Sequence, residues 1–441
     1  MPALAFVANK QNLNSIAVLT GALEAHPRYH ALPLQFVWQD ERLLPRLRAL
    51  ARQHDRLAIA LSFATASLPE MTALMANLST QMPACHVIAG GPHPSARPAE
   101  VLALGAGTVV IGEGEQTLPL LLDRLFAGEP VADLPGVATL DRRDKPIQGR
   151  RPEPVDLNTY PPLGVQHRRF GPIEITRGCS CACTFCQTSF LFGGKMRHRS
   201  VESVSTWVQR AMEQGYSYVR FVTPNAFAYQ SQDNGRTVNL DAIEHLLQDM
   251  ASLVGRDRVY FGTFPAEVGP ETLSREAVAL VRRYCGNESL IFGAQTGSDR
   301  LLRMLRRNHT VADVYRAAEL TRAGGLTPVV DLIFGLPGEE DDDIAATLTL
   351  MEDLVAMGAI LHTHTFMPLP GTPLEEAPPG RVDPMLHSLL DRLASQGHQI
   401  GQWRKQEELA RRALARPTRA GRSETNENGP GSGQMLNPGP L

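Results

Sequence analysis

The sequence predicts an α/β protein in which an N-terminal doubly wound (Rossmann-like) domain is followed by a partial (β/α)6 barrel and C-terminal helices. Its 441 residues exceed what one ordinary compact core holds. Two stretches of the chain alternate short apolar runs with amphipathic segments, which is typical of parallel sheets covered by helices. A stretch rich in proline and charge separates them. The expected division is a first domain at 1–130, a linker at 131–168, a barrel at 169–380, a helical segment at 381–416 and a disordered tail at 417–441.

Five apolar runs predict the strands of the first domain, with amphipathic segments between consecutive runs. They are ALAFVA, LPLQFVW, RLAIALSFA, CHVIAGG and TVVIGEG, near Leu4, Leu34, Ile59, Val87 and Val109. Ligands of such sheets bind at the carboxyl ends of the strands. The candidate ligand-binding turns therefore contain Ser62, Thr65, Gly90, Gly91, His93, Gly112, Glu113 and Gly114.

Six further apolar runs predict the barrel, after a linker with one small hairpin. They are PIEITRG, YSYVRFVTP, RVYFGTFP, SLIFGAQ, TPVVDLIFG and ILHTHTFMP. Amphipathic segments lie between them, so active residues are expected at the carboxyl ends of the strands. One or two amphipathic helices within 385–415 are expected to pack against the barrel. The polar end of the chain, rich in glycine and proline, is expected to be disordered.

Composition narrows the possible partners and the compartment. The 43 basic and 46 acidic residues give a net charge of -3, which predicts neither a nucleic-acid nor an anionic-membrane footprint. The N-terminus shows no export signal, and no apolar run approaches the roughly 20 residues that cross a bilayer. We therefore expect a cytoplasmic protein. Four of its six cysteines lie between 179 and 186, which in that compartment favours metal binding over disulfides.

Three cysteines directly after the first barrel strand form the pattern CxxxCxxC: Cys179, Cys183 and Cys186. Three thiolates on one loop can each hold one iron of a cubane and leave the fourth iron open. The alternatives are structural zinc, which usually takes four ligands in two separated pairs, and a redox disulfide. Cys181 fits neither the cubane spacing nor a fourth-ligand role, so we expect it to be a bystander.

This motif and the strands that follow, from about 173 to 373, resemble a radical S-adenosylmethionine (SAM) domain. The resemblance implies that Cys179, Cys183 and Cys186 hold a [4Fe-4S] cluster and that SAM chelates the open iron. It also places Phe185 near the adenine. An electron from the cluster would cleave SAM to methionine and a 5'-deoxyadenosyl radical, which abstracts hydrogen from a substrate.

Other positions match the family's SAM-binding motifs less closely. Asn225, in VTPNAF, stands where the family often has a GGE-like motif, and a plain strand-end turn role is an equal alternative. The segment GAQTGSDRLL is similar to the pattern G-x-E-S-G-S; it offers Gln295, Thr296 and Ser298 but lacks the carboxylate. Gly335, in DLIFGLPGEE, stands at a turn that flanks adenine and ribose in the family, with packing alone as the alternative.

A basic run follows the cysteine loop and ends at Ser200. Its sequence, KMRHRS, is by default a solvated turn, and contact with an anionic substrate or a cofactor phosphate is the alternative. Ser200 is suited to cap the next helix.

The first domain resembles the cobalamin-binding domains of cobalamin-dependent radical SAM enzymes, on the segments VIAGGPHPSARPAE and VVIGEGEQTL. The motif DxHxxG is absent, so cobalamin is expected to bind without the axial histidine that this motif supplies. Glycines let backbone approach a flat corrin ring. The expected contacts are Gly90, Gly91, Gly112 and Gly114 for the ring, Ser62 and Thr65 for the nucleotide, Glu113 for corrin amides or as a helix cap, and His93 near the cobalt.

The leading hypothesis is a cobalamin-dependent radical SAM enzyme that methylates an unactivated carbon of a small or peptidic molecule. It implies [4Fe-4S], SAM and cobalamin as cofactors, and a low-potential electron donor of the flavodoxin or ferredoxin type. One alternative is rearrangement, cyclisation or oxidation without methyl transfer. Another is a non-catalytic redox or cobalamin sensor. A role like that of the tRNA methylthiotransferases is disfavoured because the sequence shows neither a further N-terminal cysteine triad nor a basic RNA module.

Overall fold

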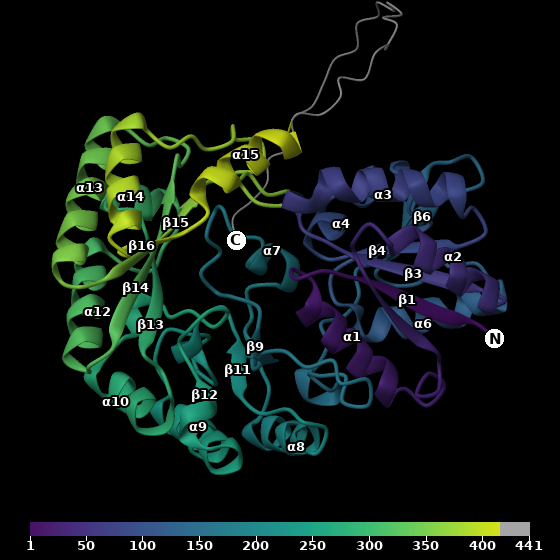
Figure 1. Ribbon diagram of the computed structural model, residues 1–441, viewed down its shortest axis with the longest axis horizontal. Helices are drawn as coiled ribbons and strands as arrows, with labels where there is room; N and C mark the ends of the chain where they lie inside the picture. The colour runs from purple at the N-terminus through teal and green to yellow at the C-terminus, as the bar shows by residue number, and fades with distance from the viewer. Residues whose placement is uncertain (415–441) are drawn as a thin grey trace, which may run out of the picture.

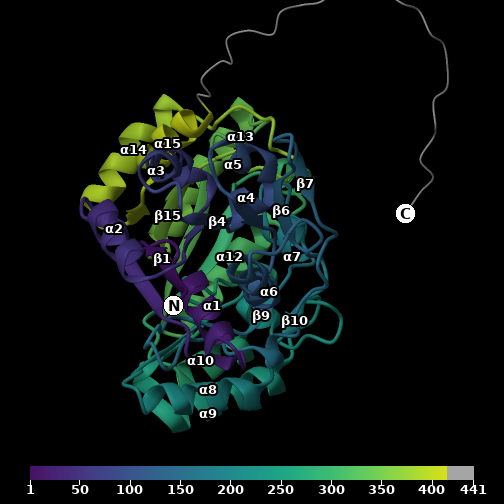
Figure 2. The ribbon, with the colours of Figure 1, turned by 90° about the vertical axis from the view of Figure 1, so that its right-hand side faces the viewer.

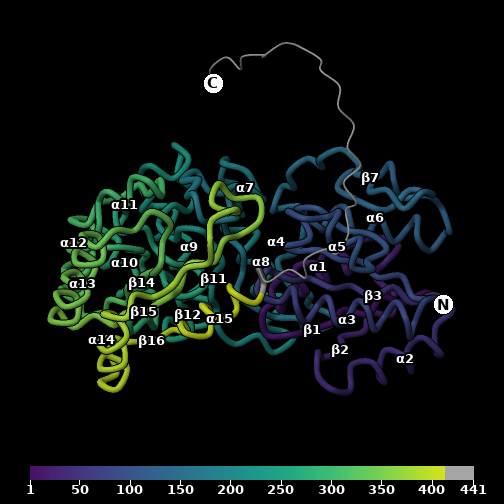
Figure 3. The backbone as a smooth tube through the Cα atoms, turned by 90° about the horizontal axis from the view of Figure 1, so that it is seen from above, coloured from purple at the N-terminus to yellow at the C-terminus, as the bar shows by residue number. Residues whose placement is uncertain are grey.

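The structure is a computed structural model that describes residues 1–414, and two α/β domains lie side by side in it (Figures 1 and 3). The disordered tail predicted for 417–441 lies outside the described residues. Among the described helices, none combines the length and apolar character needed to span a membrane.

The N-terminal domain is built on a seven-stranded sheet in the order β2-β1-β3-β4-β5-β6-β7. The first five strands are parallel, as predicted, and the last two are antiparallel additions. The strands are β1 (Ala3–Ala8), β2 (Leu34–Trp38), β3 (Leu57–Ser62), β4 (His86–Gly90), β5 (Thr108–Val110), β6 (Val137–Leu140) and β7 (Pro146–Gln148). The hairpin of β6 and β7 falls in the range predicted as a linker, and it extends this sheet.

Helices cover both faces of the sheet. α1 (Leu13–Ala25) and α6 (Gly114–Ala127) contribute Leu23 and Leu121 to the core on one face. α2 (Leu43–Gln53) and α3 (Leu68–Gln81) contribute to the core on the other face, with the short helices α4 (Pro92–Ala96) and α5 (Pro98–Ala103) after β4. Figure 2, which views this domain from its own side, shows α2 and α3 on one side and α1 and α6 on the other. The doubly wound architecture predicted from the sequence is confirmed.

The second domain contains the six predicted strands in two parallel sheets, β12-β11-β8 and β13-β14-β15 with one added strand. Val268 and Phe292 form a parallel bridge between the two sheets, which closes them into a partial barrel. The strands are β8 (Ile173–Glu174), β11 (Val219–Val222), β12 (Val259–Tyr260), β13 (Ser289–Gln295), β14 (Thr327–Phe334) and β15 (Ile360–Thr365). Around them lie α8 (Val201–Met212), α9 (Leu240–Val254), α10 (Arg275–Tyr284), α11 (Asp299–Met304), α12 (Val311–Ala323) and α13 (Asp341–Ala356). The prediction of a partial barrel is confirmed.

Two inserted elements follow β8. The short strands β9 (Thr176–Arg177) and β10 (Arg197–His198) pair antiparallel, and the cysteine loop and α7 (Thr188–Phe192) lie between them. Ser200 caps α8, as predicted, because its side chain accepts a hydrogen bond from the backbone N–H of Ser203.

The C-terminal segment does more than pack on the barrel. α14 (Pro384–Ser395) is followed by β16 (Gln399–Gly401), a strand that the sequence did not predict and that pairs parallel with β15. α15 (Trp403–Leu414) then contacts β15, and it also contacts α3 and the turn at Thr65–Ser67 of the first domain. It crosses from one domain to the other at the top of Figure 1.

Candidate functional site

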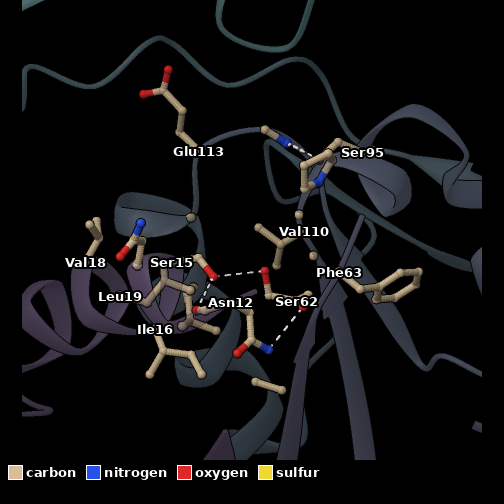
Figure 4. Close-up of a pocket in the computed structure, with 18 of the residues that line it drawn as sticks. Asn12, Ser15, Ile16, Val18, Leu19, Ser62, Phe63, Ser95, Val110 and Glu113 are labelled. Carbon is tan, nitrogen blue, oxygen red and sulfur yellow. Dashed lines mark hydrogen bonds between the residues drawn. The ribbon is translucent and has the colours of Figure 1, made fainter. Parts of the chain in front are cut away.

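A cavity of about 420 Å³ lies at the carboxyl edge of the first sheet, where the two domains meet. Its floor is made of strand ends and the turns after them, and one wall is the apolar side of α1, including Ile16 and Leu19 (Figure 4). Glu174, Arg177 and Phe192 of the second domain also line it. The cavity therefore joins the edge predicted to bind a ligand to the strand that leads into the cysteine loop.

Short hydrogen bonds hold the floor of this cavity. Asn12 donates from Nδ2 to the carbonyl oxygens of Val7 and Ser62, at 2.9 and 3.2 Å. The Oγ atoms of Ser15 and Ser62 are 3.0 Å apart (Figure 4). At Gly91, φ is 96°, and a Cβ would lie 2.9 Å from backbone atoms of Phe63. Only glycine fits that turn without a backbone shift.

The structure brings six of the eight predicted first-domain residues to this cavity: Ser62, Gly90, Gly91, Gly112, Glu113 and Gly114 line it. The other two predicted residues, Thr65 and His93, are not among its lining residues and are buried. Nδ1 of His93 lies 3.2 Å from Oγ1 of Thr65, and its ring stacks on Phe63. The glycine turns leave room for a flat ring, and the apolar wall fits the aromatic base of a nucleotide tail, so the cavity could hold cobalamin.

Glu113 belongs to a buried ion-pair network that crosses the domain interface. Arg177 lies 3.1 Å from Glu113 and 2.6 Å from both Glu115 and Glu174. Arg197, the strand partner of Arg177, forms a further ion pair with Glu113. The side chains of Arg177, Glu113 and Glu115 are 7%, 8% and 4% exposed. We call Glu113, Glu115, Glu174, Arg177 and Arg197 the interface ion network.

The network is charged. Burial acts to lower the pKa of Arg177, but the carboxylates of Glu174 and Glu115 outweigh it and raise that pKa above its ordinary value. Burial acts to raise the pKa of Glu113, but Arg197 and Arg177 outweigh it and hold that pKa below its ordinary value. The basic run at 195–200 is therefore not a solvated turn as predicted, since Arg197 pairs with the first domain and Arg199 is 2% exposed.

The cysteine loop begins directly after Arg177. At Gly178, φ is 87°, and a Cβ would lie 2.5 Å from the carbonyl oxygen of Lys195. Cys179 donates its N–H to the carbonyl of Gly193 at 3.2 Å, and Ser189 donates its hydroxyl to the carbonyl of Cys179 at 2.7 Å. Cys186 donates its N–H to the carbonyl of Cys183 at 3.1 Å. These bonds curl the loop, and Cys179, Cys183 and Cys186 lie close enough for their charges to affect one another.

Two of the thiols have a lowered pKa. A hydrogen bond from the thiol of Cys181 is the main cause that lowers the pKa of Cys179 to about 7 and that of Cys183 to about 6, and Arg307 adds to the second effect. Nη1 of Arg307 lies 3.4 Å from Sγ of Cys183. Burial raises the pKa of Cys186. The thiolate is the form that binds iron, so Cys179, Cys183 and Cys186 could hold the cluster. The thiol of Cys181 forms hydrogen bonds with those of Cys179 and Cys183.

The predicted SAM contacts lie around the carboxyl ends of the barrel strands, and several already have partners in the protein. Phe185 packs with an apolar cluster that includes Leu336 and Phe366. Oδ1 of Asn225 accepts from two backbone N–H groups, those of Phe227 and Gly269, at 3.2 Å each.

The turn after β13 is tied to α13. Oγ1 of Thr296 lies 3.1 Å from Oγ1 of Thr347, and Ser298 donates its hydroxyl to Asp343 at 2.5 Å while capping α11. Gln295 has a φ of 72° and is buried. At Gly335, φ is 69°, and a Cβ would lie 2.4 Å from the backbone nitrogen of Arg381. The side chains of Thr296 and Ser298 thus fix the turn after β13, which leaves the backbone of that turn for contact with a ligand.

Sequence reasoning missed a polar group inside the barrel: Glu267, Asp331, His362 and His364. Burial is the main cause that raises the pKa of Glu267 to about 8, and the nearby charge of Asp331 adds to it. The alternation of His362 and His364 on a strand places both on one face, and that alternation was the available signal. No sequence pattern predicted a role for Arg307, because only the fold brings it to Cys183.

Two family profiles match separate parts of the chain. The profile of the radical SAM superfamily matches residues 173–351, and that of the B12-binding domain matches residues 14–122.

Curated relatives share about a quarter to a third of the aligned residues. An uncharacterized protein of Methanopyrus kandleri is 28% identical over 343 residues, which cover 66% of this chain and 62% of that protein. A tRNA-2-methylthio-N(6)-dimethylallyladenosine synthase of Geobacter sulfurreducens is 27% identical over 277 residues, which cover 60% of this chain and 59% of the relative. The chain thus spans about three fifths of the length of these relatives.

Solved structures show the same fold. The radical SAM methyltransferase TsrM of Kitasatospora setae, with tryptophan substrate and a SAM analogue bound, aligns with a TM-score of 0.65 and 19% identity over 85% of this chain and 75% of its own. The cobalamin-dependent radical SAM enzyme OxsB, with aqua-cobalamin bound, aligns with a TM-score of 0.59 and 14% identity over 80% of this chain and 52% of its own. At these identities the likeness concerns the fold.

Proposed function

Because this chain belongs to the radical SAM superfamily and carries a B12-binding domain before its radical SAM domain, we propose that it methylates an unactivated carbon of a small or peptidic substrate. Its cofactors are a [4Fe-4S] cluster, SAM and cobalamin. When bound, the cluster would supply the electron that cleaves one SAM, and cobalamin would pass on a methyl group taken from a second SAM, which becomes S-adenosylhomocysteine. A low-potential donor of the flavodoxin or ferredoxin type would deliver the electron.

One observation carries this proposal: the cavity at the carboxyl edge of the first sheet is lined by the strand that leads into the cysteine loop. Arg177 lines the cavity and stands two residues before Cys179. A carbon without a lone pair cannot attack a methyl cation donor, so a substrate radical and a methyl group must meet in one chamber. The protein's role is to orient the two reacting groups and exclude competing reactions.

The proposal assigns roles to the residues of the two sites. The glycine turns at Gly90, Gly91 and Gly112, with Gly114 and Ser62, approach the corrin and its nucleotide. Glu113 acts as part of the interface ion network, and Thr65 and His93 support the turn from the side away from the cavity. Cys179, Cys183 and Cys186 hold the cluster, and Phe185, Asn225, Gln295, Thr296, Ser298 and Gly335 shape the SAM site.

Methylthio transfer to tRNA is the competing function, because several curated relatives are tRNA-2-methylthio-N(6)-dimethylallyladenosine synthases. The match of residues 14–122 to a B12-binding domain favours cobalamin chemistry for this chain instead. The net charge of -3 gives no electrostatic reason to expect tRNA binding.

The test is anaerobic reconstitution of the full chain with iron, sulfide and hydroxocobalamin, followed by reduction in the presence of SAM. Mass spectrometry of 5'-deoxyadenosine and S-adenosylhomocysteine reads the outcome. Both products together support methyl transfer through cobalamin, and 5'-deoxyadenosine alone indicates a radical rearrangement, cyclisation or oxidation. Neither product, from protein that holds cluster and cobalamin, would support a sensor and overturn the proposal.

A matched pair of variants tests the cluster ligands. Cys183→Ala removes a proposed ligand and should abolish reductive SAM cleavage and lower the iron content. Cys181→Ala removes a neighbouring thiol of the same loop, and it should keep both because bound iron itself deprotonates its thiol ligands. Loss of activity in Cys181→Ala with full activity in Cys183→Ala would refute the ligand assignment.

A further inference from the structure

Three members of the polar group inside the barrel, Asp331, His362 and His364, lie on one face of the neighbouring strands β14 and β15. In the parallel pairing of β14 and β15, Asp331 is opposite His362, and Ile333 is opposite His364. Alternate residues of a strand share a face, so Asp331, His362 and His364 project together. The intervening residues, such as Leu332, pack into the core under the helices. The three polar side chains therefore face the interior of the barrel.

Their donor atoms converge. Oδ1 of Asp331 lies 2.7 Å from Nδ1 of His362, and Nε2 of His364 lies 3.3 Å from the same Nδ1. One donor atom from each of the three residues lies within 4.8 Å of the others. Asp331 is 4% exposed, and the carboxyl group of Glu267 forms a hydrogen bond with it. One carboxyl group and two imidazoles thus lie close together in the interior, and the carboxyl group of Glu267 lies beside Asp331.

We propose that Asp331, His362 and His364 bind one divalent transition-metal ion, for which Zn²⁺ is the best match, with Glu267 beside it as a further carboxylate. Imidazole nitrogen and carboxylate oxygen are the donors that Zn²⁺ takes in sites with three protein ligands, and such sites keep an open position. The open position would face the barrel interior. An oxygen or nitrogen atom of a substrate could then bind the ion and be held near the cysteine loop.

Gln406 of α15 controls the tautomer of His364. Its Oε1 accepts the N–H of Thr365 at 3.0 Å, so its Nε2 faces Nδ1 of His364, also at 3.0 Å, and donates to it. This places the ring proton of His364 on Nε2. Binding the ion through Nε2 moves the proton to Nδ1, which then needs an acceptor. A carboxylate at position 406 would supply that acceptor, as in the carboxylate–histidine–zinc arrangement.

The experiment measures Zn²⁺ bound to the reconstituted full chain, whose cluster cysteines are occupied by iron. The protein is equilibrated with Zn²⁺ and a competing chromogenic chelator, and zinc per chain is counted by mass spectrometry after desalting. We expect one Zn²⁺ per chain. Asp331→Asn and His364→Gln should each weaken binding at least about tenfold, and Gln406→Glu should tighten it about tenfold.

The matched control is His245→Gln. His245 lies on α9 beside Asp249 at 3.9 Å, as an exposed histidine–carboxylate pair, and its loss should leave the count at one. Circular dichroism confirms the fold of each variant, and the gain expected in Gln406→Glu does not depend on a variant that removes a ligand. No zinc above the chelator background, or zinc retained in both Asp331→Asn and His364→Gln, overturns the proposal. Zinc binding is measured without turnover, so its failure leaves the proposed function standing.

Discussion

Removal of Arg177 should loosen the contact between the two domains. Its guanidinium lies 3.1, 2.6 and 2.6 Å from the carboxylates of Glu113, Glu115 and Glu174, and the Arg177 side chain is 7% exposed. Arg177→Leu keeps the apolar bulk but leaves the buried carboxylates of Glu113 and Glu115, and the partly buried one of Glu174, short of one positive charge. Removing one partner of a buried ion pair costs about 3–5 kcal/mol. For a cooperative unit of about 150–250 residues, each kcal/mol shifts Tm by about 2–4 °C, so Tm should fall by about 6–20 °C.

The assay is thermal unfolding of the cofactor-free full chain, followed by far-ultraviolet circular dichroism at low and high salt. The control is Arg124→Leu, whose partners Glu129 and Asp133 lie at 3.3 and 3.6 Å on the surface of the first domain. An exposed pair contributes about 0–1 kcal/mol and is screened by salt. If Arg177→Leu unfolds at the same temperature as the control in both salts, the interface ion network does not hold the domains together.

Three further outcomes are expected. Gly91→Ala forces a Cβ to within 2.9 Å of the Phe63 backbone at a φ of 96°, which costs about 1–3 kcal/mol. The cobalamin retained after desalting should fall at least about tenfold, and full retention would contradict the assigned corrin contact. Arg307→Met removes a positive charge 3.4 Å from Cys183, so the cluster's reduction potential should fall, as read by redox titration with electron paramagnetic resonance, and an unchanged potential would count against it. The pKa of Glu113 is lowered in the folded state. Its contribution to stability is therefore present above its ordinary pKa of about 4.3 and is lost as pH falls through the folded value. Glu113→Gln should flatten the acid side of the plot of stability against pH, and a plot parallel to that of the unchanged protein would refute this.

The sequence predicted those parts of the fold that depend on local patterns. The alternation of apolar runs located all eleven predicted strands, and the cysteine spacing located the loop after β8. Long-range pairing left no such pattern. β16 has three residues, two of them exposed, so its sequence shows no buried face; it pairs only because α14 returns the chain to the edge of β15.

The candidate site, too, has residues that local patterns predict and residues that only the fold brings together. Glycine turns at strand ends are local signals, and six of the eight predicted first-domain residues line the cavity. Glu115 and Glu113, which pair with Arg177 and Arg197, belong to the other domain and lie more than sixty residues away in the chain. The sequence therefore predicted a solvated turn for the basic run that contains Arg197. His362 and His364 alternate along a strand, but their meaning depends on Asp331 of the neighbouring strand.

Two of the contacts between the domains lead to the chamber where the chemistry is proposed. On one side, Arg177 pairs with Glu113 and Glu115 of the first domain and directly precedes Gly178, at the start of the cysteine loop. On the other side, α15 touches α3 and the barrel, and its Gln406 contacts His364 inside the barrel. A change in how the domains sit would therefore reach the cluster loop through Arg177 and the barrel interior through Gln406. Because these are separate routes, Arg177→Leu should alter cobalamin retention and SAM cleavage while leaving zinc binding at His364 intact. Gln406→Glu should alter zinc binding at His364 while leaving cobalamin retention and SAM cleavage intact.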